Sequence, residues 1–212
     1  MTVTLDRRSA LKARHRQAIV DAARALIDER GGPHFGVDEL ARRADVSRRT
    51  VFNHFESLDD VILAACIEIL DAVVATFREA AATTSPADDR LDAIFEELVR
   101  TVRSVDLPQR TAYLWQALGG AQAPAARQLQ FMQVSLSRIG DDLVAEVTTR
   151  HPDADALDLR LLGSSLLHGV AVVAEGWIEE HGGALTPASR ASWDRLMDRL
   201  VDRMRTGYGT GR

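Results

Sequence analysis

Apolar residues recur along nearly the whole chain at intervals of three and four, the spacing that places them on one face of an α-helix. Glycine and proline interrupt this pattern between segments, and no segment shows the alternation typical of a β-strand. The sequence therefore predicts an all-α protein of about nine helices. Besides two short helices within residues 35–56, the predicted helices span residues 11–31, 57–80, 91–105, 108–118, 124–149, 154–181 and 187–205.

The two short helices lie within the most informative segment of the chain, residues 35–62 (FGVDELARRADVSRRTVFNHFESLDDVI). Asp45 stands at the turn between them, where a left-handed backbone is usual and Asp tolerates it better than most residues. Ser47 can cap the second helix, because its hydroxyl can accept a free backbone N–H. Val51 and Phe55, four residues apart, are predicted to face the first helix. The apolar face of the first helix consists of Val37, Leu40, Ala41 and Ala44. Such a helix-turn-helix places one helix in the major groove of DNA.

The opposite face of the second helix is predicted to be polar and basic, with donors suited to phosphates and base edges. Each feature also has an ordinary explanation, since short helix pairs are common and Arg48 and Arg49 could be a solvated face. The combination of small residue, turn residue, capping serine and basic face favours DNA binding. The candidate DNA-contacting residues are Arg14, Arg16, Ser47, Arg48, Arg49, Thr50, Asn53 and His54.

Charge is distributed unevenly along the chain. Residues 1–55 hold 11 Lys and Arg against 7 Asp and Glu, a formal charge of +4, whereas the remainder carries −9. The net charge of −5 does not exclude DNA binding, because salt screening limits each patch to about 8–10 Å. The basic residues that could form either a solvated tail or a DNA-contacting arm are Arg7, Arg8, Lys12, Arg14 and Arg16.

Residues 16–62 resemble the DNA-binding domain of TetR-family transcriptional regulators. The resemblance runs through Arg16-x-x-Ile19-x-x-Ala22-Ala23-x-x-Leu26, Val37-Asp38-Glu39-Leu40-Ala41, Asp45-Val46-Ser47 and Thr50-Val51-Phe52-x-His54-Phe55. It implies an all-helical homodimer with a three-helix DNA-binding domain and a larger domain that binds a small effector and dimerises. We therefore expect residues 1–56 to form an N-terminal arm and DNA-binding domain. Residues 57–212 then form the effector-binding and dimerisation domain, with residues 57–80 as the connecting helix.

Residues 154–181 are apolar around much of the predicted helix, which indicates that this helix is buried. It could be a core helix of one subunit or part of a subunit interface, and the resemblance implies dimerisation through the last two helices. The predicted interface residues are Leu162, Leu166, Gly169, Val173, Trp193, Leu196 and Leu200.

The resemblance also implies an effector pocket among the helices from residue 57 to residue 181. Aromatic residues at helical spacing are more often ordinary core, and His168 could be a satisfied core histidine or an effector contact. The candidate pocket residues are Phe77, Phe95, Tyr113, Trp115, Gln116, Phe131, Ser135, His168 and Trp177. Because most of them are apolar, a hydrophobic or aromatic effector is favoured.

The sequence carries no recognisable catalytic motif, cofactor motif or metal-ligand spacing. No Glu is followed three residues later by His, and neither a phosphate-binding glycine loop nor a nucleophile-elbow serine occurs. Cys66, the one cysteine, cannot form an intramolecular disulfide and is predicted to lie in the core. Without a signal-like segment or a run of about 18 apolar residues, we expect a cytoplasmic protein with no membrane partner.

These observations together predict a regulator, not an enzyme: a homodimer that binds a palindromic operator in double-stranded DNA. We expect a repressor that a small, mostly apolar effector releases from the operator. Two alternatives stay open, a helical-bundle enzyme whose site is assembled by tertiary structure and a non-specific DNA-binding protein.

Overall fold

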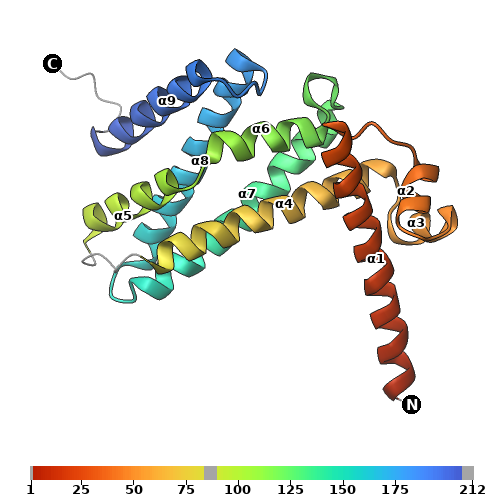
Figure 1. The fold of residues 1–212 in the computed structure, drawn as a ribbon. Helices are drawn as coiled ribbons and strands as arrows, with labels where there is room; N and C mark the ends of the chain where they lie inside the picture. Colours follow the sequence, from red (N-terminus) through yellow and green to blue (C-terminus); the bar gives the residue numbers. More distant parts are fainter. Residues whose placement is uncertain (1, 84–89, 207–212) are drawn as a thin grey trace. The chain divides into compact units, whose positions relative to one another are not determined.

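The computed structural model describes residues 2–83 and 90–206, with side chains from Ser9 onward. All regular structure in these ranges is helical, so the predicted all-α fold is confirmed. The helices are α1 (Thr2–Arg30), α2 (Val37–Arg43), α3 (Arg48–His54), α4 (Leu58–Ala82), α5 (Leu91–Ser104), α6 (Leu107–Leu118), the short 3₁₀ helix η1 (Gly120–Gln122), α7 (Ala125–Arg150), α8 (Ala156–His181) and α9 (Pro187–Thr206) (Figure 1).

The first helix differs most from its predicted bounds. α1 begins at Thr2, well before the predicted residue 11. The prediction omitted residues 2–10 because they lack the apolar periodicity on which it relied. Its end is where glycine predicts it: Gly31 has φ +65°, a left-handed conformation that only glycine adopts without strain. The N–H of Gly32 then donates to the carbonyl of Ile27 at 3.1 Å, which satisfies one of the free carbonyls at the helix end.

The chain packs into two compact units that do not coincide with a single cut in the sequence. The first unit is Met1–Ile69 with Leu114–Phe131, and the second is Leu70–Tyr113 with Met132–Arg212. Three helices, α4, α6 and α7, contribute residues to both units. This division concerns packing, and the functional boundary after residue 56 stays a prediction.

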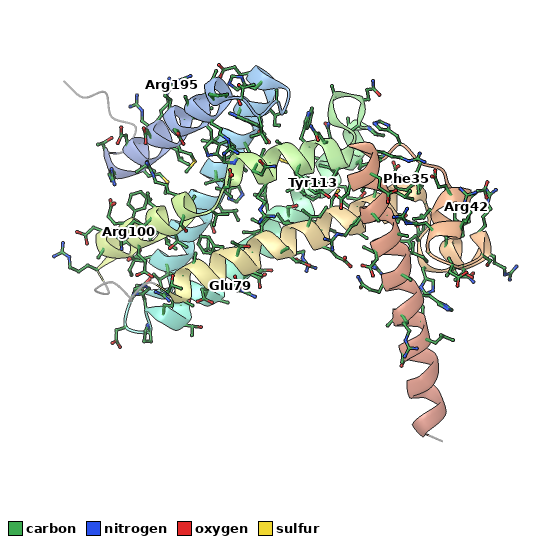
Figure 2. The ribbon with its side chains drawn as sticks, viewed as in Figure 1. Phe35, Arg42, Glu79, Arg100, Tyr113 and Arg195 are labelled. Carbon is green, nitrogen blue, oxygen red and sulfur yellow. The ribbon has the colours of Figure 1, made fainter. Side chains whose placement is uncertain are left out.

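The core of the first unit is built from the apolar faces of α1 to α4. Its fully or almost fully buried side chains are Ile19, Val20, Ala23, Leu26, Ile27, Leu40, Val51, Val61, Ile62, Ala65 and Cys66. Phe35, in the loop that joins α1 to α2, is also buried and labelled in Figure 2. Helices α1, α2 and α3 are thus held by a continuous core that includes the start of α4.

The core of the second unit lies between α5, α8 and α9 and the adjoining parts of α4, α6 and α7. One cluster contains Ile94, Leu98, Leu143, Val147, Leu159 and Leu166. A second contains Ala112, Val173, Trp177, Trp193 and Met197. The indole N–H of Trp177 donates to the carbonyl of Ser189 at 2.7 Å, and its ring meets Trp193 edge-on at 5.7 Å. Trp177 is therefore a core residue of this unit, and its contact with an effector stays a prediction.

The predicted interface residues of α8 and α9 pack mainly within one chain. Leu166, Val173 and Trp193 are only 1%, 7% and 4% exposed, so they have almost no surface left for a partner. A side chain at Gly169 would collide with Leu200, which shows that glycine permits the close approach of α8 to α9. Leu162, Leu196 and Leu200 pack against the same clusters. The close approach of α8 to α9 at Gly169 is thus a contact within one chain.

The outer face of α8 keeps a row of exposed apolar side chains. Leu157, Leu161 and Val172 are 62%, 57% and 66% exposed. Among the described helices α8 alone is long and apolar enough, by length and composition, to cross a membrane, which is weak evidence for such a role. The exposed row is an apolar surface of the kind that commonly marks an interaction site.

Candidate DNA-binding surface

The local geometry of the helix-turn-helix follows from residues within four positions of one another. Asp45 has φ +53°, the left-handed turn conformation that the sequence predicts. The Ser47 hydroxyl accepts the N–H of Thr50 at 3.0 Å and so caps α3. Val51 and Phe55 are 1% and 6% exposed, so one face of α3 is fixed in the core. The rotation of α3 about its axis is therefore set, and its other face is directed outward.

The predicted DNA-contacting side chains on the outward face of α3 differ in whether they already have partners within the protein. Arg49 and Asn53 are exposed and, within the part of the chain that the structure describes, have no hydrogen-bonding or ionic partner. Arg48 is also exposed but pairs with Asp38 on α2 at 3.2 Å. Thr50 is half-buried and its hydroxyl lies 2.8 Å from that of Ser47, so both of these residues serve the cap.

The first helix supports the C-terminal end of α3. The Arg16 guanidinium lies 4.7 Å above the centre of the Phe55 ring, a cation–π contact that ties α1 to the end of α3. The His15 and His54 rings meet edge-on at 6.2 Å. Arg14 is exposed, whereas the side chains of Arg7 and Arg8 lie outside the described residues. Arg16 and His54 thus have a structural role beside any contact with DNA.

The protonation of His54 is set by this arrangement. Burial lowers the pKa of His54 below its usual 6.5, and the nearby charges of Lys12, His15 and Arg16 lower it further. His54 is accordingly neutral at physiological pH in the free protein. A neutral imidazole offers one donor and one acceptor, and contributes no charge toward a phosphate.

The start of α4 is capped by two side chains of its own first turn. The Ser57 hydroxyl accepts the N–H of Asp60 at 3.1 Å, and the Asp60 carboxylate accepts the N–H of Ser57 at 2.9 Å. This reciprocal pair is a capping box, and it orients the first turn of α4 beside α3.

One residue of the first unit was missed by the sequence analysis. Arg127, at the start of α7, forms an ion pair with Asp59 on α4, and its guanidinium also donates to the carbonyl of Leu118 at 2.7 Å. The side chain of Arg127 is only 10% exposed, whereas that of Asp59 is 51% exposed. Arg127 therefore joins the α6–α7 segment to α4, the helix that follows α3. The partners are 68 positions apart, and no local pattern could have indicated the contact.

The predicted effector-contacting residues are divided between the two units. Trp115, Gln116 and Phe131 belong to the first unit, whereas the other six belong to the second. Phe95 lies in a core cluster of its own unit. His168 is exposed on the outer face of α8, with Nδ1 2.8 Å from the carbonyl of Ser164. It is therefore neither a core histidine nor, in this arrangement, a pocket residue.

A small cavity in the second unit contains one of the predicted residues. Phe77 lines it together with Ala81, Ile94, Leu98 and Val147, which form its apolar wall. The polar wall consists of Glu97, Thr101, Glu146, Arg150 and His151.

Three charged or ionisable groups of this polar wall, Glu97, Arg150 and His151, lie together and are largely buried. Arg150 donates to Oε1 of Glu97 at 2.7 and 3.0 Å, and His151 Nε2 lies 3.5 Å from Oε2. Ser135, which is buried elsewhere on α7, has a hydroxyl without a hydrogen-bond partner. No sequence pattern indicates the Glu97–Arg150–His151 cluster, because α5 and α7 are brought together only by folding. Among the described residues no group of His, Cys, Asp and Glu is arranged to hold a metal ion.

Comparison with known proteins agrees with the geometry of the first unit. Residues 19–65 match the model of the family described as bacterial regulatory proteins, tetR family. The HTH-type transcriptional activator FasR of Mycolicibacterium smegmatis is 35% identical over 83 residues, which are 39% of this chain and 37% of that protein. The match thus spans little more than a third of the curated relative.

A solved structure extends the likeness over nearly the whole fold. The crystal structure described as a TetR-family transcriptional regulator of Mesorhizobium loti superposes with a TM-score of 0.59. The superposition covers 94% of this chain and 98% of that one, at 19% sequence identity, so it shows a common fold. Residues 19–65, with their capped and outward-facing α3, thus match the DNA-binding region of the tetR family of bacterial regulatory proteins, and the chain as a whole shares the fold of a TetR-family regulator.

Proposed function

We propose that the protein is a homodimeric, sequence-specific transcriptional regulator that binds a palindromic operator through α3. The observation that carries this proposal is the outward face of α3, where Arg49 and Asn53 are exposed and without partners among the described residues. Asn can form a bidentate pair with adenine, and Arg can pair with guanine or with a phosphate. The buried side chains of Val51 and Phe55 hold these groups in a fixed orientation.

The exposed row on α8 supports dimerisation with a second copy of the chain. Leu157, Leu161 and Val172 lie four and eleven positions apart, so they fall on one side of the helix. Pairing this side with its symmetry mate would remove the apolar surface from water, as an isologous interface does. Two recognition helices would then read half-sites about 34–36 Å apart or at a multiple of that distance. We therefore propose that this exposed row, and not the buried residues of α8, forms the dimer interface.

We further propose that a small effector acts through the second unit. The cavity beside Phe77 has a volume of only about 10 Å³, so it would have to widen to admit an effector. Its wall is apolar on one side and carries the paired Glu97 and Arg150 on the other. An effector changes operator affinity only if it binds the DNA-incompetent state more tightly. Two features could carry that change to α3. Helix α4 is continuous through both units, and Arg127 joins the α6–α7 segment to Asp59.

The first experiment identifies the operator. Bound sites would be selected from a library of genomic fragments, and the affinity for the recovered palindrome compared with that for scrambled DNA at one salt concentration. A sequence-specific regulator should prefer the palindrome by at least about a thousandfold. Equal affinity for both DNAs, with steep salt dependence, would instead indicate a non-specific DNA-binding protein.

The second experiment uses Arg49→Ala with Arg195→Ala as the matched control. Arg195 is exposed on α9 in the second unit (Figure 2), so the control removes the same charge outside the proposed surface. Arg49→Ala should weaken operator binding, and the control should not. A loss confined to the operator assigns Arg49 to base recognition, whereas an equal loss on scrambled DNA assigns it to a phosphate. If Arg49→Ala leaves affinity unchanged, α3 is not the recognition helix.

The direction of regulation is decided by a reporter assay. We propose repression, so deletion of the gene should raise transcription from the operator-bearing promoter. FasR is named an activator, and a fall in transcription on deletion would assign that role here. In either case, an effector that leaves operator affinity unchanged would contradict the proposed mechanism.

A further inference from the structure

One side chain on the recognition helix has no role in the arrangement described so far. Phe52 is 48% exposed, although it is a large apolar residue in a well-packed unit. The neighbouring Val51 and the later Phe55 are buried and already supply the apolar contacts by which α3 joins the core. About half of the surface of Phe52 is therefore left in water in the free protein, although Val51 and Phe55 already anchor α3 in the core.

The surroundings of Phe52 are polar and positively charged. Arg48 and Arg49 precede it by four and three positions, so the three side chains share one side of α3. Asn53 follows directly and is also exposed. Each of these neighbours is suited to DNA, and none offers the ring an apolar partner. An exposed apolar ring beside cationic side chains is complementary to a binding partner that is negatively charged overall and presents an apolar group next to the ring.

Base pairs in the major groove present one apolar group, the C5-methyl of thymine, among hydrogen-bond donors and acceptors. A phenyl ring has no hydrogen-bonding atom, so it cannot satisfy the polar edges of guanine, cytosine or adenine. It also lacks the hydroxyl with which a tyrosine would contact a phosphate. Contact with a methyl removes apolar surface of both partners from water, which is favourable in proportion to the area buried.

We propose that Phe52 is a specificity-determining residue that recognises the methyl group of a thymine in each operator half-site. This inference rests on the proposed function, because it requires α3 to enter the major groove. It adds a base preference to the polar contacts of Arg49 and Asn53. It also explains why the exposed ring lies on α3.

The test replaces single thymines by deoxyuridine, a change that removes only the methyl group. Operator duplexes with deoxyuridine at each thymine position in turn would be compared with the natural duplex by fluorescence anisotropy at fixed salt. Each half-site should contain one sensitive thymine. Loss of its methyl in one half-site should weaken binding about fourfold, and loss in both half-sites should weaken binding about fifteenfold.

Variants of the protein assign the effect to Phe52. With Phe52→Ala, the natural and deoxyuridine operators should bind equally, because the ring that distinguishes them is absent. Phe52→Leu keeps an apolar contact and should retain part of the difference. Asn53→Ala is the matched control: it should weaken binding to both duplexes and leave their ratio unchanged. Since Phe52 is exposed, these variants should keep the melting temperature of the natural protein.

Each outcome separates the inference from the proposed function. If the natural protein binds its operator but is indifferent to deoxyuridine at every thymine, the inference is wrong and the proposed function stands. If Phe52→Ala retains the fourfold difference, another residue contacts the methyl and the inference is again wrong. If no preferred operator is recovered at all, the proposed function fails and the inference fails with it.

Discussion

The contact between α8 and α9 at Gly169 allows a quantitative test of the C-terminal packing. In Gly169→Ala, the added methyl would lie 2.4 Å from Cδ1 of Leu200, 3.0 Å from Cδ2 and 3.2 Å from Cγ. Favourable contact between carbon atoms requires about 3.5–4.0 Å. Leu200 must therefore turn away from its present position, or the two helices must separate.

Gly169→Ala should change the free energy of unfolding in opposite directions in the natural protein and in a Leu200→Ala variant. Overpacking a core typically costs about 1–3 kcal/mol, whereas alanine is favoured over glycine in a helix by about 1 kcal/mol. In the natural background, Gly169→Ala should therefore lower the free energy of unfolding by about 1 kcal/mol. In a Leu200→Ala background the clash is absent, and the same substitution should raise it by about 1 kcal/mol. The coupling between the two positions is then about 2 kcal/mol, within the usual range for residues in contact.

The measurement is urea unfolding followed by far-ultraviolet circular dichroism. All variants must be compared at one protein concentration, because the stability of a dimer depends on concentration. Gly140→Ala on α7 is a suitable control, since its added methyl would meet only Leu167 at an ordinary 3.6 Å. It should stabilise the protein by about 1 kcal/mol in both backgrounds. Equal effects of Gly169→Ala in the two backgrounds would refute this packing. So would a loss of dimer affinity without a loss of unfolding free energy.

Four further predictions concern single groups. Ser47→Ala removes the cap of α3 and should destabilise the protein by about 1 kcal/mol and weaken operator binding, as measured by thermal melting and mobility shift. Burial raises the pKa of the Cys66 thiol to about 12, so iodoacetamide at pH 8 should leave the folded protein unmodified by mass spectrometry and alkylate it in urea. Burial, with neighbouring cations, lowers the pKa of His54 in the folded protein. As pH falls, His54 is therefore protonated in the unfolded chain at a higher pH than in the folded protein. Stability should therefore decline as pH falls below 6.5, and less so in His54→Gln, when unfolding is measured at successive pH values. Glu97→Ala leaves the buried Arg150 without its carboxylate and should cost about 3–5 kcal/mol in urea unfolding, more than Glu97→Gln.

Each of these predictions has a result that contradicts it. A melting temperature unchanged by Ser47→Ala would show that the α3 cap does not contribute to stability. Rapid alkylation of the folded protein would show that Cys66 is accessible. An unaltered pH profile in His54→Gln would assign the acid sensitivity to other groups. Equal stability of the natural protein and Glu97→Ala would show that the pair with Arg150 is not buried in solution.

The features that the sequence determined are those whose causes lie within a few residues. The turn at Asp45, the caps at Ser47 and Ser57 and the buried pair on α3 all depend on neighbours at most four positions away. Helix ends at glycine and proline follow for the same reason. The outward direction of Arg49 and Asn53 also follows, because Val51 and Phe55 fix which face of the helix is buried.

The direction in which α8 faces could be decided only by tertiary structure. A helix that is apolar on all sides has no periodicity to show which side meets α9, so the buried Leu166 and the exposed Leu161 look alike in sequence. The pairs Arg127–Asp59 and Arg150–Glu97 join positions 68 and 53 residues apart. Such contacts depend on how whole helices pack, and a pattern that repeats every three or four residues carries no information about distances of that length.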